Sequence, residues 1–410
     1  MTIAGEGIAP MPPGTAESDK SAAPAPPPQF ALWSVGFRPF FLFAGAFAVI
    51  AIATWVAQYG GWLGGYASRM AGPLWHAHEM IFGYTLAVLV GFLFTAVHNW
   101  TGQPTPSGLP LAALVMVWLA ARILVATPWH VLAAVFDTAF AAAAAFAIAR
   151  PLLRGRSRRN YFLVAVVLAL GAANLAFYLA MAGVRHFSAE RDLQVGLDVI
   201  LFVITVMGGR IIPMFTANAL KQASPRRVAW IEHAALGSVL AIALADLADL
   251  PAIAIAAIAG IAAIAHAARL VLWRPWLTAT RPILWILHAS YAWIVVYLAL
   301  RALLPLAGMP ASLATHALTV GAIGGLTIGM MTRTARGHTG RPLRSGRMET
   351  AAFILLQLAV VTRVFVPLAS PRFYVAAIMV SGALWSLAFG LFVAKFWPIL
   401  ARPRSGGRVS

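Results

Sequence analysis

The chain has 410 residues, of which 61% are hydrophobic and only 10% are charged. A soluble globular domain needs about a quarter charged residues, so the composition excludes that class and indicates an integral membrane protein. The formal net charge of +18 does not indicate a nucleic-acid partner, because the cationic residues lie mostly in short loops between apolar segments. The absence of cysteine excludes iron–sulfur clusters, c-type haem attachment and thiolate copper.

The first 30 residues are rich in Pro, Ala, Gly and Ser and contain no hydrophobic signal core. We predict that residues 1–30 form a disordered cytoplasmic tail, 31–400 a single membrane domain, and 401–410 a second cytoplasmic tail. The apolar runs do not alternate with polar residues, which predicts an all-α polytopic protein with about twelve transmembrane helices. The predicted spans are 37–58, 75–97, 109–126, 129–149, 160–182, 194–217, 228–247, 251–272, 282–303, 312–333, 350–368 and 373–397.

Basic residues follow the even-numbered spans and are few in the odd-numbered loops. The densest cluster, RPLLRGRSRR at 150–159, follows the fourth span. Because short cytoplasmic loops are enriched in Lys and Arg, this pattern predicts that both termini are cytoplasmic.

One segment occurs twice, 238 residues apart. The copies are HEMIFGYTLAVLVGFLFTAVHNWTGQP at 78–104 and HALTVGAIGGLTIGMMTRTARGHTGRP at 316–342, and they align His78 with His316. Two matching membrane helices with a histidine at the same outer depth are what a bis-histidine haem b requires. The repeat therefore makes His78 and His316 candidates for haem ligation.

Each copy also carries a stripe of small residues at a spacing of four. These stripes are Gly83-Ala87-Gly91 and Gly321-Gly325-Gly329. Two interpretations stand: close helix–helix packing, which such stripes commonly mark, or a groove for a flat macrocycle.

His76 precedes His78 by two residues, so on a regular helix their side chains point about 200° apart. Either the two face different sites or only one is functional, and we expect His76 to face a second cofactor, another haem or copper. Glu79 follows the two histidines at the start of an apolar span, where three polar side chains are costly to place in the membrane without a partner. His98 and His338 lie near the inner face, where they form a second metal site or are interfacial loop residues.

His288 is a weaker metal-ligand candidate, because a single interior histidine is more often satisfied by hydrogen bonds. His266 is predicted to lie at a span end or in a loop, together with His130 and His186.

Arg122, Arg301 and Arg363 fall in the outer halves of the third, ninth and eleventh spans. Intramembrane arginine needs an anionic partner, and the acids at that depth are Glu79 and Asp198. Three arginines against two acids leave room for an outside anion such as a haem propionate. The alternative is internal pairing.

Arg210 lies in GGRIIPMFT, where Pro213 is expected to break the helix and expose carbonyl groups. Arg333 in the second repeat copy is a further candidate functional residue. Asp137 lies at mid-membrane depth with no evident partner, which suits a proton relay or a carboxyl group held protonated.

Four segments resemble the NnrS family: LWSVGFRPFFLFAG, WHAHEMIFGYTLAVLVGFLFTAVHNWTG, GGRIIPMFTANAL and HALTVGAIGGLTIGMMTRTARGHTGRPL. The resemblance covers nearly all of the chain after residue 30. It implies a bacterial inner-membrane protein linked to nitric oxide and nitrosative stress that contains haem and copper.

The two copies lie eight spans apart, which suggests three pseudo-symmetric four-helix units with spans 2, 6 and 10 equivalent. Haem–copper oxidases and nitric oxide reductases share this layout and hold a haem by histidines of helices 2 and 10, and the likeness to them implies His78 and His316 as the pair. Span 6 has no histidine here, so their three-histidine copper site does not carry over.

The leading hypothesis is haem and copper redox chemistry on nitric oxide or a related small molecule, with a quinol or another electron donor. The main alternative is a transporter or metal-trafficking protein without catalytic haem chemistry, although a repeat at a six-helix offset is absent. A haem-based nitric oxide sensor is a third option, but the chain has no signalling domain.

Overall fold

The computed structural model describes residues 30–63, 70, 72–184, 188–221 and 224–404. Within these residues the chain is helical and contains no β-strand. Twelve helical segments are long and apolar enough to cross a membrane, which confirms the all-α, multi-pass prediction. Almost all of the predicted tail 1–30, the end of the predicted tail 401–410, and His186 lie outside the described residues.

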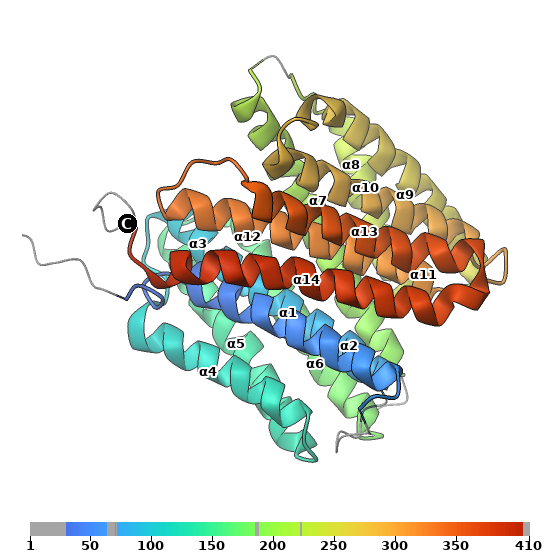
Figure 1. The fold of residues 1–410 in the computed structure, drawn as a ribbon, viewed down its shortest axis with the longest axis horizontal. Helices are drawn as coiled ribbons and strands as arrows, with labels where there is room; N and C mark the ends of the chain where they lie inside the picture. Colours follow the sequence, from blue (N-terminus) through green and yellow to red (C-terminus); the bar gives the residue numbers. More distant parts are fainter. Residues whose placement is uncertain (1–29, 64–69, 71, 185–187, 222–223, 405–410) are drawn as a thin grey trace, which may run out of the picture.

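The spans form a bundle of roughly antiparallel helices (Figure 1). Spans 2 and 10 each consist of three consecutive helical pieces, and each other span is built around one α-helix. In chain order the pieces are α1 (Phe37–Tyr59), α2 (Gly72–His78), η1 (Glu79–Thr85), α3 (Leu86–Thr101), α4 (Gly108–Val125), α5 (His130–Arg154), η2 (Arg158–Asn160), α6 (Phe162–Met181), α7 (Ala189–Ala219), α8 (Ala229–Leu247), α9 (Ala252–Leu272), η3 (Pro275–Thr278), α10 (Pro282–Leu303), α11 (Ser312–His316), η4 (Ala317–Gly324), α12 (Gly325–His338), α13 (Arg347–Ala369), η5 (Pro371–Phe373) and α14 (Tyr374–Ala401).

Both copies of the sequence repeat contain a π-helix at the same place. The π-helical segment η1 begins directly after His78, and η4 begins directly after His316. The π-helix is rare and occurs frequently at functional sites, because its wider turn re-aims the side chains around it. The two copies of the repeat therefore share a conformation as well as a sequence pattern, in the first halves of spans 2 and 10.

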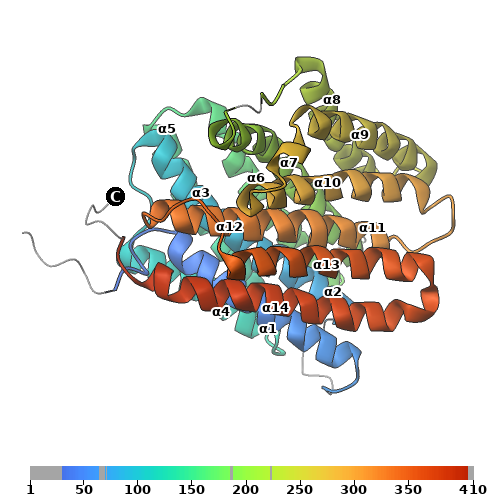
Figure 2. The same cartoon turned by 45° about the horizontal axis from the view of Figure 1, so that its top comes forward.

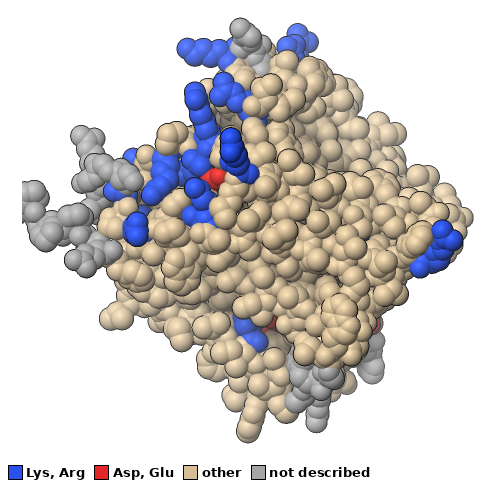
Figure 3. Space-filling view, viewed as in Figure 1, with Lys and Arg blue, Asp and Glu red and all other residues tan. Residues whose placement is uncertain are grey.

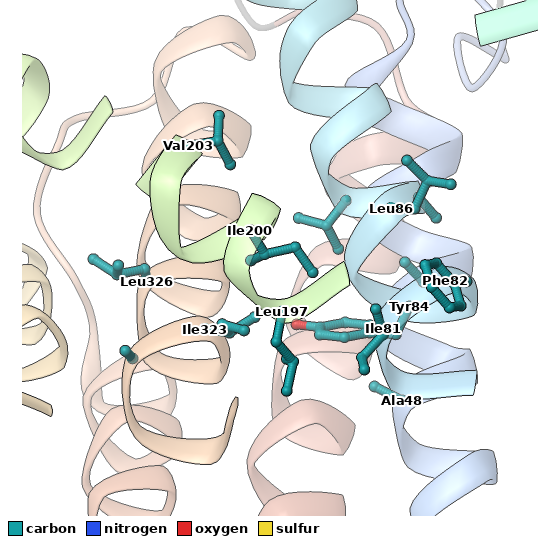
Figure 4. Close-up of a cluster of buried hydrophobic side chains, with 14 of the residues drawn as sticks. Ala48, Ile81, Phe82, Tyr84, Leu86, Leu197, Ile200, Val203, Ile323 and Leu326 are labelled. Atoms are coloured by element: carbon teal, nitrogen blue, oxygen red, sulfur yellow. The ribbon is translucent and has the colours of Figure 1, made fainter. Parts of the chain in front are cut away.

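Spans 2, 6 and 10 meet in the centre of the bundle. Figure 4 shows Ile81 and Leu86 of span 2, Leu197 and Ile200 of span 6, and Ile323 of span 10 around one apolar core. With α10, these are the most buried of the described spans: the most apolar 18-residue stretch is 83% buried in span 2, 61% in span 6, and 67% in both span 10 and α10. Spans 2, 6 and 10, which are four apart in sequence, thus lie in the interior together with α10.

Spans that follow one another in the chain lie side by side. Figure 2 shows α10, α12, α13 and α14 in this order, and α1 packs against α14. The two described ends of the chain also meet, because the Ala31 N–H donates to the Ala401 carbonyl at 2.8 Å. Arg38 Nη1 donates to the carbonyls of Leu400 at 2.8 Å and Arg402 at 2.6 Å. Both ends therefore lie on one face, as an even number of spans requires.

Most of the Lys and Arg side chains visible in Figure 3 lie toward the end of the bundle where α14 finishes, and the body is almost free of charge. This distribution agrees with helices that cross an apolar layer.

The expected break at Pro213 is wrong, because α7 continues from Ala189 to Ala219 through the proline. A proline removes one backbone donor, and a long membrane helix packed between neighbours tolerates that loss.

The glycine stripes of spans 2 and 10 serve close helix packing. A Cβ atom added to Gly91 would lie 2.7 Å from the Phe40 side chain, and one added to Gly329 would lie 2.9 Å from Leu287. A Cβ atom on Gly321 would overlap the indole of Trp293. Neighbouring helices thus fill the two stripes, and no room for a macrocycle remains along them.

Replacing Gly321 with Ala is therefore expected to destabilise the protein by about 1–3 kcal/mol through overpacking against Trp293. Gly237 in α8 is a matched control, since an added Cβ there meets no atom within 4 Å. Gly237→Ala is expected to leave stability unchanged or to raise it by up to about 1 kcal/mol. Unfolding of both variants in detergent checks this, and equal stabilities would contradict the packing argument.

Candidate functional site: a cavity between two histidines

A cavity of about 380 Å³ opens between spans 1, 2, 6, 10, 11 and 12. Its polar lining includes His76, His316 and Arg363, and aromatic walls come from Trp55 and Trp385. The beginnings of α7 and α11 line it as well, so the cavity lies toward the end of the bundle opposite the chain ends. Its size and its apolar walls with a few convergent polar groups suit a small-molecule or cofactor site.

His76 and His316 face each other across part of this cavity. Their ring centres are 6.3 Å apart and their planes differ by 9°. Trp55 stacks on His76 with ring centres 5.1 Å apart. The Nδ1–H of His316 donates to the Ser312 carbonyl at 2.6 Å, because a carbonyl only accepts. This bond fixes the tautomer and leaves the Nε2 lone pair of His316 available.

The spacing of the two rings fits a metal held between them. His76 Nδ1 is buried and has no hydrogen-bond partner among the described residues. With their ring centres 6.3 Å apart, His76 and His316 would be the residues that hold a metal ion in this cavity, each through one ring nitrogen. Within the described part of the chain, no three His, Asp or Glu side chains converge as a metal site.

His78 does not pair with His316, which corrects the ligand pair expected from the repeat. The His78 ring is completely buried and points away from the cavity toward spans 4 and 5. Its Nδ1 is 2.8 Å from Glu79 Oε1, and its Nε2 is 2.8 Å from Asn174 Oδ1. Both ring nitrogens are therefore engaged by the protein.

Arg122 lies in the same buried cluster as His78. Its Nη1 donates to Glu79 Oε1 at 2.6 Å, and its Nη2 contacts Asp137. The Tyr178 hydroxyl donates to Asp137 Oδ2 at 2.8 Å. Asp137 is thus well partnered, contrary to the sequence expectation. Arg122 is neutralised by two carboxylates and cannot serve an outside anion.

Arg301 is also neutralised internally. Its Nη1 lies 3.7 Å from Asp198 Oδ1, and its Nη2 contacts Asp246. Of the three arginines proposed to bind an anion, only Arg363 lines the cavity.

The remaining candidate histidines lie outside the cavity. His98 Nδ1 bonds the Gln103 carbonyl at 2.9 Å, and the His338 ring lies 5.5 Å from that of Phe37. His288 is buried, and its Nε2 is 2.9 Å from Thr216 Oγ1.

Arg210 and Arg333 make local contacts away from the cavity. Arg210 Nη1 donates to Asn160 Oδ1 at 3.1 Å. The Arg333 guanidinium lies 3.7 Å from the centre of the Phe215 ring. These contacts fit cation–π and hydrogen-bond partners of half-buried arginines.

A second buried polar network surrounds His266, which the sequence placed at a span end. His266 Nε2 is 3.1 Å from the Ala235 carbonyl, and its Nδ1 accepts from the Tyr291 hydroxyl at 2.8 Å. Arg269 donates to Tyr291 at 2.9 Å and to both oxygens of Glu232. The signal was present, because His266 and Arg269 are three apart and share one face of α9.

A smaller cavity of about 110 Å³ lies at the centre of spans 2, 6 and 10. Its lining is almost entirely apolar and includes Val203, Met207 and Leu326. Thr85 and Ile323 line both cavities, so the two are neighbours. An apolar pocket of this kind suits a small apolar molecule.

The fold and this site define a class: a twelve-span helical membrane protein in which histidines of two repeated spans share one cavity. The sequence model of the NnrS protein family matches residues 31–404, nearly the whole chain, and the chain belongs to that family. This membership supports a membrane protein of the nitric-oxide response. No curated protein matches the chain.

Proposed function

We propose that the protein holds a haem b between His76 and His316 and acts on nitric oxide or a related species in the nitrosative-stress response. The observation that carries the proposal is the pair of imidazole rings, 6.3 Å apart and nearly parallel, inside the cavity. Family membership supplies the link to nitric oxide. A quinol or another membrane donor would supply the electrons.

The residues present fit this group. His316 is oriented through Ser312 with one nitrogen free, and His76 has a buried nitrogen without a partner among the described residues. A haem with two histidine ligands supplies one-electron redox chemistry. Trp55 and Trp385 contribute flat apolar walls that exclude water. The adjoining apolar cavity offers nitric oxide, a small and weakly polar molecule, a place beside the site.

The proposed setting is the bacterial inner membrane with both termini in the cytoplasm. The basic loops after even-numbered spans support this orientation. The histidine cavity then lies toward the outer face.

The expected result is haem in the purified full-length protein, with reduced-minus-oxidised spectra of a b-type haem that has two nitrogen ligands. Metal analysis of the same sample distinguishes iron from copper, which the same two histidines would also bind. Protein that contains neither haem nor copper after purification from haem-supplemented cells would overturn the proposal.

A further inference from the structure

Equivalent positions at the outer ends of spans 2, 6 and 10 are separated by equal numbers of residues along the chain, and two of the three are carboxylates. Half of the 238-residue offset, 119 residues, leads from Glu79 to Asp198 and on to Ala317. The first two positions are carboxylates, and each contacts a buried arginine: Glu79 contacts Arg122, and Asp198 contacts Arg301. The third position is an alanine and supplies no counter-charge.

A tyrosine accompanies each of the two neutralised arginines. Tyr178 and Tyr297 are also related by 119 residues. Tyr178 donates to the Asp137 carboxylate that contacts Arg122, and the Tyr297 hydroxyl accepts from Arg301 at 2.7 Å. The carboxylates at the outer ends of spans 2 and 6 are therefore each part of a buried cluster of arginine, carboxylates and tyrosine.

Beside the outer end of span 10, Arg363 forms no ion pair with a carboxylate of the described residues, although the exposed Glu190 also lines the cavity. Arg363 is 6% exposed and lines the histidine cavity. Its Nη1 is buried without a hydrogen-bond partner among the described residues, and its Nη2 lies 3.3 Å from the Tyr374 hydroxyl. Its guanidinium is 5.0 Å from the Tyr374 ring. None of the ion pairs formed by the described carboxylates includes Arg363. A buried cation without a counter-charge is costly.

We propose that Arg363 binds a planar oxyanion in the cavity, either the carboxylate of a bound molecule or a small inorganic anion such as nitrite. The ligand supplies the carboxylate or oxyanion that the chain itself supplies to Arg122 and Arg301. Arginine presents its donors as a planar fork that matches two oxygens on one centre. The hydroxyls of Tyr374 and Ser312 lie 3.3 Å apart beside it and offer further donors. The inference requires no metal and therefore goes beyond the function proposed above.

Titration calorimetry with formate and with nitrite tests the proposal on the full-length protein in detergent. Arg363→Gln is expected to weaken binding by about tenfold or more, because a charge-assisted hydrogen bond is lost. The Ser312 hydroxyl lies 3.3 Å from the Tyr374 hydroxyl, which itself lies 3.3 Å from Arg363 Nη2, and Ser312 lines the cavity. Ser312→Asp is therefore expected to supply an internal counter-charge and to abolish binding. Ser312→Asn has the same size without the charge and is expected to retain it.

The two sources of the anion are distinguished by comparing haem-loaded with haem-free protein. A free anion binds to both preparations and depends on Arg363 in each. A cofactor carboxylate blocks formate and nitrite in the loaded protein, and Arg363→Gln then releases haem faster. Both outcomes support the site. Wild-type protein that binds neither anion and releases haem as slowly as Arg363→Gln would overturn it, as would equal binding by Ser312→Asp and Ser312→Asn. The titration of haem-free protein tests the anion site independently, because it gives a result even if the protein binds no haem.

Discussion

His76→Ala and His316→Ala are each expected to remove nearly all haem from the purified protein. The two rings are the ones that share the cavity, and neither ring has a protein partner for more than one of its nitrogens among the described residues. Loss of either ring would remove one of the two histidines that would hold the proposed haem, so the spectrum of a haem with two nitrogen ligands is expected to be lost as well. Haem quantification and reduced-minus-oxidised spectra of both variants measure this.

His98→Ala is the matched control, because His98 lies in α3, far along the same span, and bonds a loop carbonyl. It is expected to retain wild-type haem content. His78→Asn separates the two possible assignments on span 2, since His78 is engaged by Glu79 and Asn174 outside the cavity. Haem that is lost with His78→Asn but kept with His76→Ala would refute the assignment made here.

The fold was largely predictable because the membrane imposes simple rules. A bilayer requires long apolar helices, so composition and run length determine the twelve spans. The π-helical segments at Glu79–Thr85 and Ala317–Gly324 were not predictable, since no pattern of apolar residues distinguishes a π-helix from an α-helix. The sequence repeat located these two segments but did not indicate that they are π-helical.

The sequence indicated which residues lie at the site, but not which of them face each other. Sequence alignment paired His78 with His316 because they are equivalent, whereas the structure pairs His316 with His76. Which neighbour each ring faces depends on how the helices pack, and a linear alignment does not contain that packing. In the same way, Asp137 and Arg122 lie on different spans, so their ion pair depends on packing that local sequence does not encode.

The second large effect concerns stability. Arg122→Met is expected to destabilise the protein by about 3–5 kcal/mol, because it leaves buried carboxylates without their counter-charge. The side chain of Arg122 is 2% exposed, and those of Glu79 and Asp137 are 1% exposed. Arg210→Met is the control, since Arg210 is half-buried and, among the described residues, donates a hydrogen bond to Asn160 Oδ1 and lies over the Phe162 ring. The control is expected to cost less than about 1 kcal/mol.

A triple variant shows why Arg122→Met destabilises the protein: either attractive contacts are lost, or Glu79 and Asp137 stay buried without a counter-charge. Adding Glu79→Gln and Asp137→Asn to Arg122→Met removes the charges that the single variant leaves unpaired, so it is expected to recover a large part of the lost stability. Unfolding in mixed detergent micelles measures all three proteins. A triple variant that is less stable than Arg122→Met would show that the cluster stabilises the bundle through its hydrogen bonds, including those to His78 and Tyr178, more than through charge balance. In that case the two clusters hold neighbouring spans together through polar contacts, and Arg363, which lines the cavity outside both clusters, stays available to a ligand.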